Sequence, residues 1–321
     1  MRLLLATGIY PPDIGGPATY AVLLEKELPK KGIDVEIITY GPAGVSRSFP
    51  KGLRHFIFFF KCFAKAFKSD VILAQDTISA GLPALFVAKL SGRKFIIRVP
   101  GDYVWEQSTQ RFGVKDSIDD FQNKKYGWRV EFLRSVQKFV VRNADVVITP
   151  SKYFGNIVYK WVKDPSKIHV IYNGISFENP KSQIQNHKQI TKNKTIVSVG
   201  RLVPWKGFGF LIELMKDLPD WKLIIIGDGP EMKNLKSQIS NLKLENQVTL
   251  TGAIQREKVL DYLRSSGVFA LNTHFESFSF QIVEAMSLGI PVITTNIGNL
   301  SEIIENGVDG ILVEPNNKRQ F

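Results

Sequence analysis

Short apolar runs bounded by turns alternate with helical patterns along this chain. The first run, residues 3–6, leads into a loop rich in proline and glycine at 8–17. Apolar positions then recur on one side of a helical pattern at 18–30, and a second apolar run follows at 35–39. Strand, loop, helix and strand in this order predict a βαβ unit with parallel strands.

The same alternation continues through two separate parts of the chain. In the first part, further strands are predicted at 71–74, 95–99, 146–149 and 170–172, and helices at 81–90 and 119–143. In the second part, strands are predicted at 195–199, 223–226, 248–250, 268–271 and 292–293. Residues 177–194 lie between the two parts and are polar without a clear period, which is typical of a linker.

This pattern predicts an α/β protein with two consecutive Rossmann-like, doubly wound parallel-sheet domains. We place the first domain at residues 1–176, the linker at 177–194 and the second domain at 195–321. Ligands often bind where two domains meet, so the expected ligand site is a cleft that both domains face.

The composition limits the cell compartment and the kinds of metal site that are compatible with this fold. The chain has 321 residues, of which 44% are hydrophobic, enough for more than one core. Its single cysteine, Cys62, excludes a disulfide framework and fits a reducing cytoplasm. The 4 histidines lack metal-site spacing and no C-x-x-C is present, so no metal held by His and Cys is predicted. No secretory signal or membrane-spanning run is evident, and we predict a cytoplasmic protein.

The formal net charge of +12 predicts attraction to an acidic partner, which could be a phosphorylated ligand, an anionic lipid or a nucleic acid. Nucleic acid has the least support, because no known binding motif is present and the basic residues are scattered. We therefore predict no nucleic-acid partner.

The segment 51–68 is both basic and rich in phenylalanine. Its basic residues are Lys51, Arg54, Lys61, Lys65 and Lys68, and it contains no acidic residue. Four of its phenylalanines fall on one stripe of a helix: Phe56, Phe60, Phe63 and Phe67. Two interpretations follow. Either the helix lies on an anionic membrane surface, so that the protein is peripheral on the inner face of the membrane, or the stripe packs on the sheet while the lysines face water.

Two glutamates, Glu276 and Glu284, stand close together in the second domain. They follow the strand predicted at 268–271, at the carboxyl end of a parallel strand, where open α/β sheets bind ligands. A helix that begins near Ser279 and ends at Gly289 would place its free N–H groups beside Glu276, where they suit an anion such as a diphosphate. The alternative is that both glutamates are ordinary solvated residues.

Two further loops leave strands of the second domain. The loop 200–207 contains Gly200, Arg201 and Lys206, so a backbone that a ligand can approach closely carries two charges that suit phosphate. A basic surface turn is the alternative. The loop that begins at Gly227 resembles a dinucleotide-binding turn but lacks its third glycine, so it is only weak support for a nicotinamide site.

The first domain has two candidate positions of its own. Gly15 and Gly16 follow the first strand and precede a helix, where backbone amides suit a phosphate, although a flexible turn is equally compatible. Asp102 follows the strand predicted at 95–99. Its carboxylate could hold a sugar hydroxyl, act as a base or cap the N-terminus of a helix.

Five sequence segments together resemble glycosyltransferase family 4, a family of retaining sugar-nucleotide transferases with the GT-B fold. They are G-G-P-A-T-Y at 15–20, I-Y-N-G-I at 171–175, G-R-L-V-P-W-K-G at 200–207, I-G-D-G-P at 226–230 and E-S-F-S-F-Q-I-V-E-A-M at 276–286. The segments follow the family's order and span nearly the whole chain, so the resemblance is specific to the family but not to one member.

The resemblance implies a role for each matching residue. Arg201 and Lys206 would neutralise the donor diphosphate, Glu284 would hold the ribose, and Glu276 would hold the donor sugar. The other implied donor-binding positions are the backbone of Phe278, Ser279 and Phe280, the loop glycines Gly200 and Gly227, Gly15 and Gly16 from the opposite domain, and Asn173 at the interdomain crossing. Asp102 matches an aspartate of the family and is carried as a catalytic candidate.

The implied function is that of a retaining hexosyltransferase. Such an enzyme moves a sugar from a UDP- or GDP-linked donor to a hydroxyl acceptor, here a lipid-linked or cell-envelope glycan. No metal or other cofactor is required, because Arg201, Lys206 and the helix N-terminus would stabilise the leaving diphosphate. Two alternatives stay open: a GT-B-like sugar-nucleotide epimerase, and a non-catalytic fragment that binds sugar nucleotides.

The chain departs from the family pattern at three places. Gly101 stands where many members have a histidine, and Ser279 stands where a glycine is usual, which would tighten access of phosphate to the backbone. The family usually continues through further helices after the position of Phe321. The resemblance therefore implies that the C-terminal helices are missing from this chain.

Overall fold

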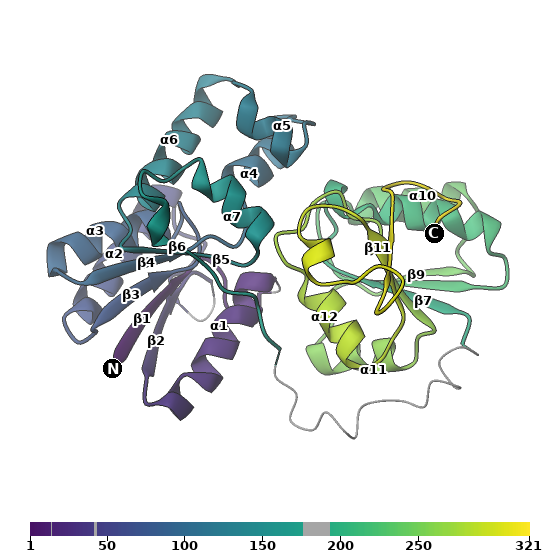
Figure 1. The fold of residues 1–321 in the computed structure, drawn as a ribbon, viewed down its shortest axis with the longest axis horizontal. Coiled ribbons are helices and arrows are strands. Elements are labelled where there is room, and N and C mark those ends of the chain that lie inside the picture. Colours follow the sequence, from purple (N-terminus) through teal and green to yellow (C-terminus); the bar gives the residue numbers. More distant parts are fainter. Residues whose placement is uncertain (14, 42–43, 176–192) are drawn as a thin grey trace. The chain divides into compact units, whose positions relative to one another are not determined.

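The computed structural model describes residues 1–13, 15–41, 44–175 and 193–321 (Figure 1). It divides into two compact units, Met1–Asn173 and Gly174–Phe321. Each unit is built on one six-stranded sheet in which all neighbouring strands run parallel, so the predicted α/β fold is confirmed. The predicted linker at 177–194 lies outside the described residues, apart from Asn193 and Lys194.

The first sheet has the strand order β2-β1-β3-β4-β5-β6. In chain order its strands are β1 (Arg2–Thr7), β2 (Asp34–Thr39), β3 (Val71–Ala74), β4 (Lys94–Arg98), β5 (Val146–Thr149) and β6 (Ile168–Val170). The strand predicted at 170–172 is wrong in its bounds. The ladder begins earlier, because Ile168 of β6 already pairs with Val147 of β5.

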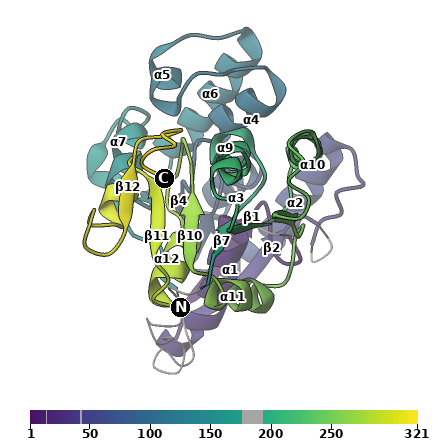
Figure 2. The same cartoon turned by 90° about the vertical axis from the view of Figure 1, so that its right-hand side faces the viewer.

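The α-helices in the described part of the first unit are α1 (Gly16–Glu27), α2 (Lys51–Ala66), α3 (Gly81–Ser91), α4 (Tyr103–Arg111), α5 (Ile118–Asn123), α6 (Trp128–Arg142) and α7 (Lys152–Tyr159). Right-handed crossovers place α1 on one face of the sheet and α2 and α3 on the other. The helix α3 contacts both α2 and α6, and α6 lies together with α4 and α5 (Figure 2). Across the described residues, no helix combines the length and the apolar content needed to cross a membrane.

The single helix predicted at 119–143 is wrong, because the structure has two helices there, α5 and α6. Lys124 follows α5 with an extended backbone, at φ −104° and ψ 155°. Arg134 of α6 donates to the carbonyl oxygens of Lys124, at 2.7 Å, and of Phe121. Since carbonyls at a helix end need partners outside the helix, this guanidinium stabilises the break.

The helix α2 packs on the sheet with a side other than the phenylalanine stripe. Its buried residues are Phe58, Cys62 and Ala66, and Phe58 stacks on Tyr40 with ring centroids 4.4 Å apart. Burial raises the pKa of the Cys62 thiol to about 12, which fits a buried apolar residue. The interpretation that the stripe packs on the sheet is therefore wrong for three of its members, which are exposed: Phe56, Phe60 and Phe67.

The second sheet has the order β12-β11-β10-β7-β8-β9. Its strands are β7 (Thr195–Val199), β8 (Lys222–Ile226), β9 (Val248–Leu250), β10 (Val268–Leu271), β11 (Val292–Thr295) and β12 (Ile311–Val313). The main connecting helices are α9 (Phe208–Leu214), α10 (Met232–Asn241), α11 (Arg256–Arg264) and α12 (Phe280–Ser287). Aliphatic strand residues and helix residues such as Leu211 and Ile282 form one core around this sheet. The strand β12 was not among the predicted strands.

Candidate functional site

The loops after β7 and β8 interlock at the carboxyl edge of the second sheet. The Gly200 amide donates to the carbonyl of Ile226 at 3.0 Å, and the Leu202 amide donates to the carbonyl of Asp228 at 3.0 Å. Gly227 has φ 143°, and a Cβ there would lie 1.9 Å from the carbonyl oxygen of Gly200. Glycine is therefore required at 227, and the loops that begin at Gly200 and Gly227 lie against each other.

The far end of the loop 200–207 is tied to the loop that follows β10. The carbonyl of Trp205 accepts a hydrogen bond from the His274 amide at 2.7 Å and one from Thr273 Oγ1 at 3.1 Å. Gly207 adopts φ 62°, and a Cβ there would lie 1.9 Å from the carbonyl oxygen of Asn272. These contacts fix Lys206, which lies between Trp205 and Gly207, close to the β10 loop.

Lys206 and Glu276 form a largely buried ion pair. The Lys206 ammonium contacts Glu276 Oε1, and both side chains are shielded from solvent, at 13% and 7% exposed. A buried carboxylate is stable only when it is paired and hydrogen-bonded, so each residue holds the other in place. The two residues predicted at the donor diphosphate and donor sugar are thus brought together by the fold.

The helix between the two glutamates begins where the sequence predicts. Ser279 is the N-cap of α12, and its side chain accepts from the Ile282 amide at 3.4 Å. Phe278 and Phe280 flank this residue with their rings 6.1 Å apart. The first turn of α12 consequently starts just after Glu276, and Glu284 lies within the helix on its buried side.

Glu284 is paired with Arg256, a residue that sequence analysis missed. Arg256 is the first residue of α11, and its Nε and Nη2 contact Glu284 Oε1 at 2.9 Å and 2.8 Å. Burial raises the pKa of Glu284, and the neighbouring guanidinium opposes that rise. Nothing in the spacing pointed to Arg256, because it lies 28 positions before Glu284 on a different helix.

Arg201 lies on the same edge as the ion pairs but at the surface. It directly follows Gly200 and its side chain is exposed, whereas Lys206 is mostly shielded. Within the described ranges, no group of three or more His, Cys, Asp and Glu side chains is arranged to hold a metal ion. Glu276 and Glu284 lie at this edge with Lys206, Arg201 and Arg256 nearby, a set suited to hydroxyls and phosphate.

Asp102 in the first unit is bound on all sides. It caps α4, with Oδ1 accepting from the Val104 and Trp105 amides at 3.0 Å and 3.1 Å. The side-chain amides of Gln137 and Gln122 donate to its two oxygens at 2.9 Å and 2.8 Å. The N-cap that the sequence offered as one interpretation is thus present, and a role toward substrate stays a prediction.

Asn173 meets a buried arginine that sequence analysis did not single out. Arg98 Nη2 donates to Asn173 Oδ1 at 2.7 Å, and the Arg98 Cζ lies 3.8 Å from the centre of the Tyr20 ring on α1. Arg98 is 1% exposed, and its Nε and Nη1 have no hydrogen-bond partner among the described residues. Burial lowers the pKa of Arg98 to about 10, so the guanidinium is still charged at neutral pH.

The glycines of the first unit lie at the start of α1. Gly15 is the N-cap residue, Gly16 is the first helical residue and Pro17 follows it. The carbonyl of Gly15 accepts the first helical hydrogen bond, from the Thr19 amide at 3.0 Å. The pair therefore sits at a helix N-terminus, as predicted, and its role toward a diphosphate stays a prediction.

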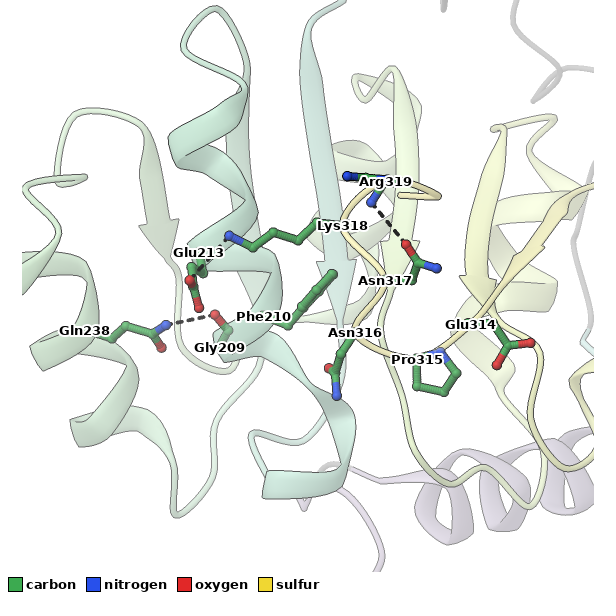
Figure 3. Close-up of a pocket in the computed structure, with 10 residues that line it drawn as sticks. All are labelled: Gly209, Phe210, Glu213, Gln238, Glu314, Pro315, Asn316, Asn317, Lys318 and Arg319. Carbon is green, nitrogen blue, oxygen red and sulfur yellow. Dashed lines mark hydrogen bonds and ion pairs between the residues drawn. The ribbon is translucent and has the colours of Figure 1, made fainter.

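The second unit has a separate pocket of about 770 Å³ (Figure 3). It is lined by Gly209, Phe210, Glu213, Gln238, Glu314, Pro315, Asn316, Asn317, Lys318 and Arg319. Lys318 bridges to Glu213 at 3.3 Å, and Gln238 donates to the Gly209 carbonyl at 2.8 Å. None of the predicted site residues lines this pocket.

Two family models match the chain: Glycosyltransferase Family 4 over residues 14–179 and Glycosyl transferases group 1 over residues 180–321. An uncharacterized glycosyltransferase of Haemophilus influenzae is 34% identical over 151 residues, which are 45% of this chain. That alignment covers 42% of the H. influenzae protein, less than half its length. The alpha-monoglucosyldiacylglycerol synthase of Streptococcus pneumoniae is 26% identical over 97% of this chain and 75% of that protein.

A solved structure confirms the fold. Anabaena HepE in complex with UDP and glucose matches with a TM-score of 0.73 at 22% identity, covering 99% of this chain and 87% of that chain. At this level of sequence identity, the structural similarity is evidence for the fold only. The predicted GT-B fold is confirmed.

Proposed function

The chain belongs to glycosyltransferase family 4, and we propose that it transfers a sugar from a UDP- or GDP-linked donor to a hydroxyl acceptor with retention of configuration. One observation carries this proposal. Two buried carboxylates, Glu276 and Glu284, lie before and after the first turn of α12. A basic side chain contacts the Oε1 atom of each. That arrangement suits a ligand with hydroxyls at both ends and an anion between them.

We assign the second oxygen of each carboxylate to the donor. A carboxylate has two acceptor oxygens, so Oε2 of Glu284 accepts from the ribose hydroxyls while Arg256 holds Oε1. Oε2 of Glu276 likewise accepts from hydroxyls of the donor sugar. Lys206 and Arg256 orient the two carboxylates, and this orientation sets the distance between the bound donor sugar and the bound ribose.

The chemical step depends on the charge that grows on the leaving diphosphate. Lys206, Arg201 and the amides at the start of α12 stabilise this charge, which is often the largest contribution to catalysis. We propose that no metal is required. The acceptor hydroxyl attacks from the side that the diphosphate leaves, the sugar–phosphate bond breaks, and the leaving phosphate takes the hydroxyl proton, so no enzymic nucleophile is involved.

For the acceptor we propose a lipid-linked or cell-envelope glycan. The exposed phenylalanines of α2 and the basic residues of 51–68 suit a protein that reaches its acceptor at an anionic membrane surface. The name of the S. pneumoniae relative refers to a glycolipid product, which is in keeping with such an acceptor. We accordingly propose a cytoplasmic protein that is peripheral on the inner face of the membrane.

A donor screen followed by transfer assays tests the proposal. A thermal-shift screen with UDP-, GDP- and ADP-sugars identifies the donor, and its hydrolysis or transfer is then measured with and without EDTA. We expect EDTA to leave the rate unchanged and Glu276→Gln to lose the activity, while the exposed control Glu245→Gln keeps it. Full activity in Glu276→Gln, or loss of activity in EDTA, would contradict the corresponding part of the mechanism.

The products separate this function from its alternatives. NMR of the product reads the configuration at the transferred sugar, and inversion would exclude the retaining step. Conversion of the donor sugar without an acceptor would indicate an epimerase. Donor binding measured by calorimetry without any turnover would indicate a non-catalytic binding protein.

A further inference from the structure

Aromatic side chains form an exposed stripe along one side of the helix α6. Trp128 and Phe132 are 76% and 62% exposed, and Phe139 is exposed on the same side two turns later. The opposite side of α6 buries Val130 and Val140. Since the buried side already packs within the unit, the aromatic side chains of α6 are not required for its core.

The stripe continues onto the neighbouring helix α3. There Phe86 and Leu90 are exposed, and the Phe86 ring lies 6.4 Å from the ring of Phe139 on α6. These two helices contact each other within one layer. The exposed apolar side chains of α6 and α3 thus form a single surface.

The helix α2 extends this surface on the other side of α3. Its phenylalanines contact one another in a chain from Phe56 to Phe67, with successive ring centroids 4.6, 5.2, 5.9 and 5.0 Å apart. Arg93, just after α3, donates from Nη2 to the carbonyl of Phe67 at 3.1 Å, which ties the two helices together. By right-handed crossovers, the three helices lie on one face of the first sheet.

The charges on these helices have one dominant sign. The helices α2 and α3 contain no Asp or Glu, and the only acidic residue of α6, Glu131, is paired with Arg134. Exposed basic residues accompany the aromatic ones: Lys61, Lys68, Lys89, Arg129 and Arg142. A second copy of the chain would bring the same charges against each other, so self-association through this face is disfavoured.

We propose that the outer side of α2, α3 and α6 is a docking surface for an anionic lipid bilayer. We call it the aromatic face and define it by Phe56, Phe60, Phe67, Phe86, Leu90, Trp128, Phe132 and Phe139. Aromatic rings enter the headgroup region while lysines and arginines around them bind anionic lipid. The inference rests on the membrane partner proposed above for residues 51–68 and adds α3 and α6 to it, so that the whole layer lies on the membrane.

Vesicle binding of single-helix variants tests whether the face acts as a unit. Wild-type chain and variants are mixed with sedimentable vesicles of phosphatidylcholine, alone or with an equal part of phosphatidylglycerol. Trp128→Ser/Phe132→Ser removes two rings from α6, and Phe56→Ser/Phe60→Ser removes two from α2. The matched control Tyr159→Ser/Val308→Ser removes two exposed side chains from α7 and from the second unit.

We expect the wild type to bind only the anionic vesicles and to dissociate as salt is raised. Each pair variant should bind about tenfold or more weakly, because each exposed ring loses the apolar area that it would bury. The control should bind like the wild type. Melting temperatures should be equal throughout, since all of these side chains are exposed.

The proposal is overturned if Trp128→Ser/Phe132→Ser binds anionic vesicles as the wild type does, since contact would then not include α6. It is also overturned if the wild type binds no vesicles, or if it sediments as a dimer that both pair variants dissociate. Hydrolysis of the soluble donor should be unaffected in every variant. A failure of the docking surface is therefore distinguishable from a failure of the proposed transferase function.

Discussion

The charged residues Glu276 and Glu284, at the carboxyl edge of the second sheet, have partners of a different kind from those of Arg98 and Asp102, at the edge of the first sheet. At the edge of the second sheet, Glu276 and Glu284 are each bound by a basic side chain, Lys206 and Arg256. At the edge of the first sheet, Arg98 is buried against a neutral amide and an aromatic ring, and backbone and glutamine N–H groups surround Asp102. Charged partners thus hold Glu276 and Glu284 at one edge, and neutral partners hold Arg98 and Asp102 at the other.

This difference separates a binding role from a framework role. The Arg256 side chain is about half exposed at 47%, so a ligand can reach its guanidinium beside the buried Glu284. The hydrogen bonds of Asp102 instead hold the start of α4 to other parts of the first unit. We infer that the second edge contributes charge to the reaction, whereas Arg98 and Asp102 of the first edge stabilise the shape of their unit.

The largest effect is expected for Lys206→Met. It removes the charge that we propose to stabilise the leaving diphosphate, and activity should then fall by about 10²- to 10³-fold. It also leaves Glu276 buried and unpaired, which should cost about 3 kcal/mol of unfolding free energy. Donor turnover and urea denaturation measure the two effects. The double variant Lys206→Met/Glu276→Gln should recover stability but not activity, and recovery of both would mean that the pair is only structural.

Asp102→Ala should lower stability with little change in turnover per folded molecule. It removes an N-cap and leaves the amides of Gln122 and Gln137 without their acceptor, at an expected cost of about 3 kcal/mol. Urea denaturation and active-site titration measure the two quantities. If the folded fraction instead loses activity a hundredfold or more, as expected of a catalytic base, Asp102 takes part in the reaction and its role is not limited to stability.

Arg256→Gln should make donor binding sensitive to pH. Burial raises the pKa of Glu284 and Arg256 opposes this, so removing the guanidinium lets that pKa rise further. The carboxylate then takes up a proton at higher pH and loses acceptor capacity for the ribose. The donor KM should rise by about tenfold toward acidic pH, and the rise should begin at higher pH than in the wild type. Identical pH profiles of KM in the two proteins would count against ribose recognition by Glu284.

The smallest effect is expected for Arg98→Met. The substitution gives up a hydrogen bond to Asn173 and the contact with Tyr20, but it also removes a buried charge that has no carboxylate partner among the described residues. These contributions oppose each other, so the unfolding free energy should change by no more than about 1 kcal/mol. If urea denaturation shows a loss of several kcal/mol of unfolding free energy, the charge of Arg98 stabilises its unit, as we expect of the charge of Lys206.

Much of the fold follows from local patterns in the sequence. The predicted strands at 71–74, 146–149, 195–199, 248–250 and 268–271 coincide with β3, β5, β7, β9 and β10, because short apolar runs between turns are a local signal. The start of α12 after Ser279 was predictable for the same reason, since an N-cap residue acts on its own first turn. The break between α5 and α6 was not, because Arg134 stabilises it from beyond the break.

The sequence by itself determined where most of the elements lie and which residue types gather at the strand ends. Only the tertiary structure decided which charges meet, since Lys206 and Glu276 are 70 positions apart and are joined by the neighbouring strands β7 and β10. It also decided which side of α2 is buried. A helix with apolar residues on several sides has no intrinsic inner face, and packing of Phe58 and Cys62 on the unit left the phenylalanine stripe outside.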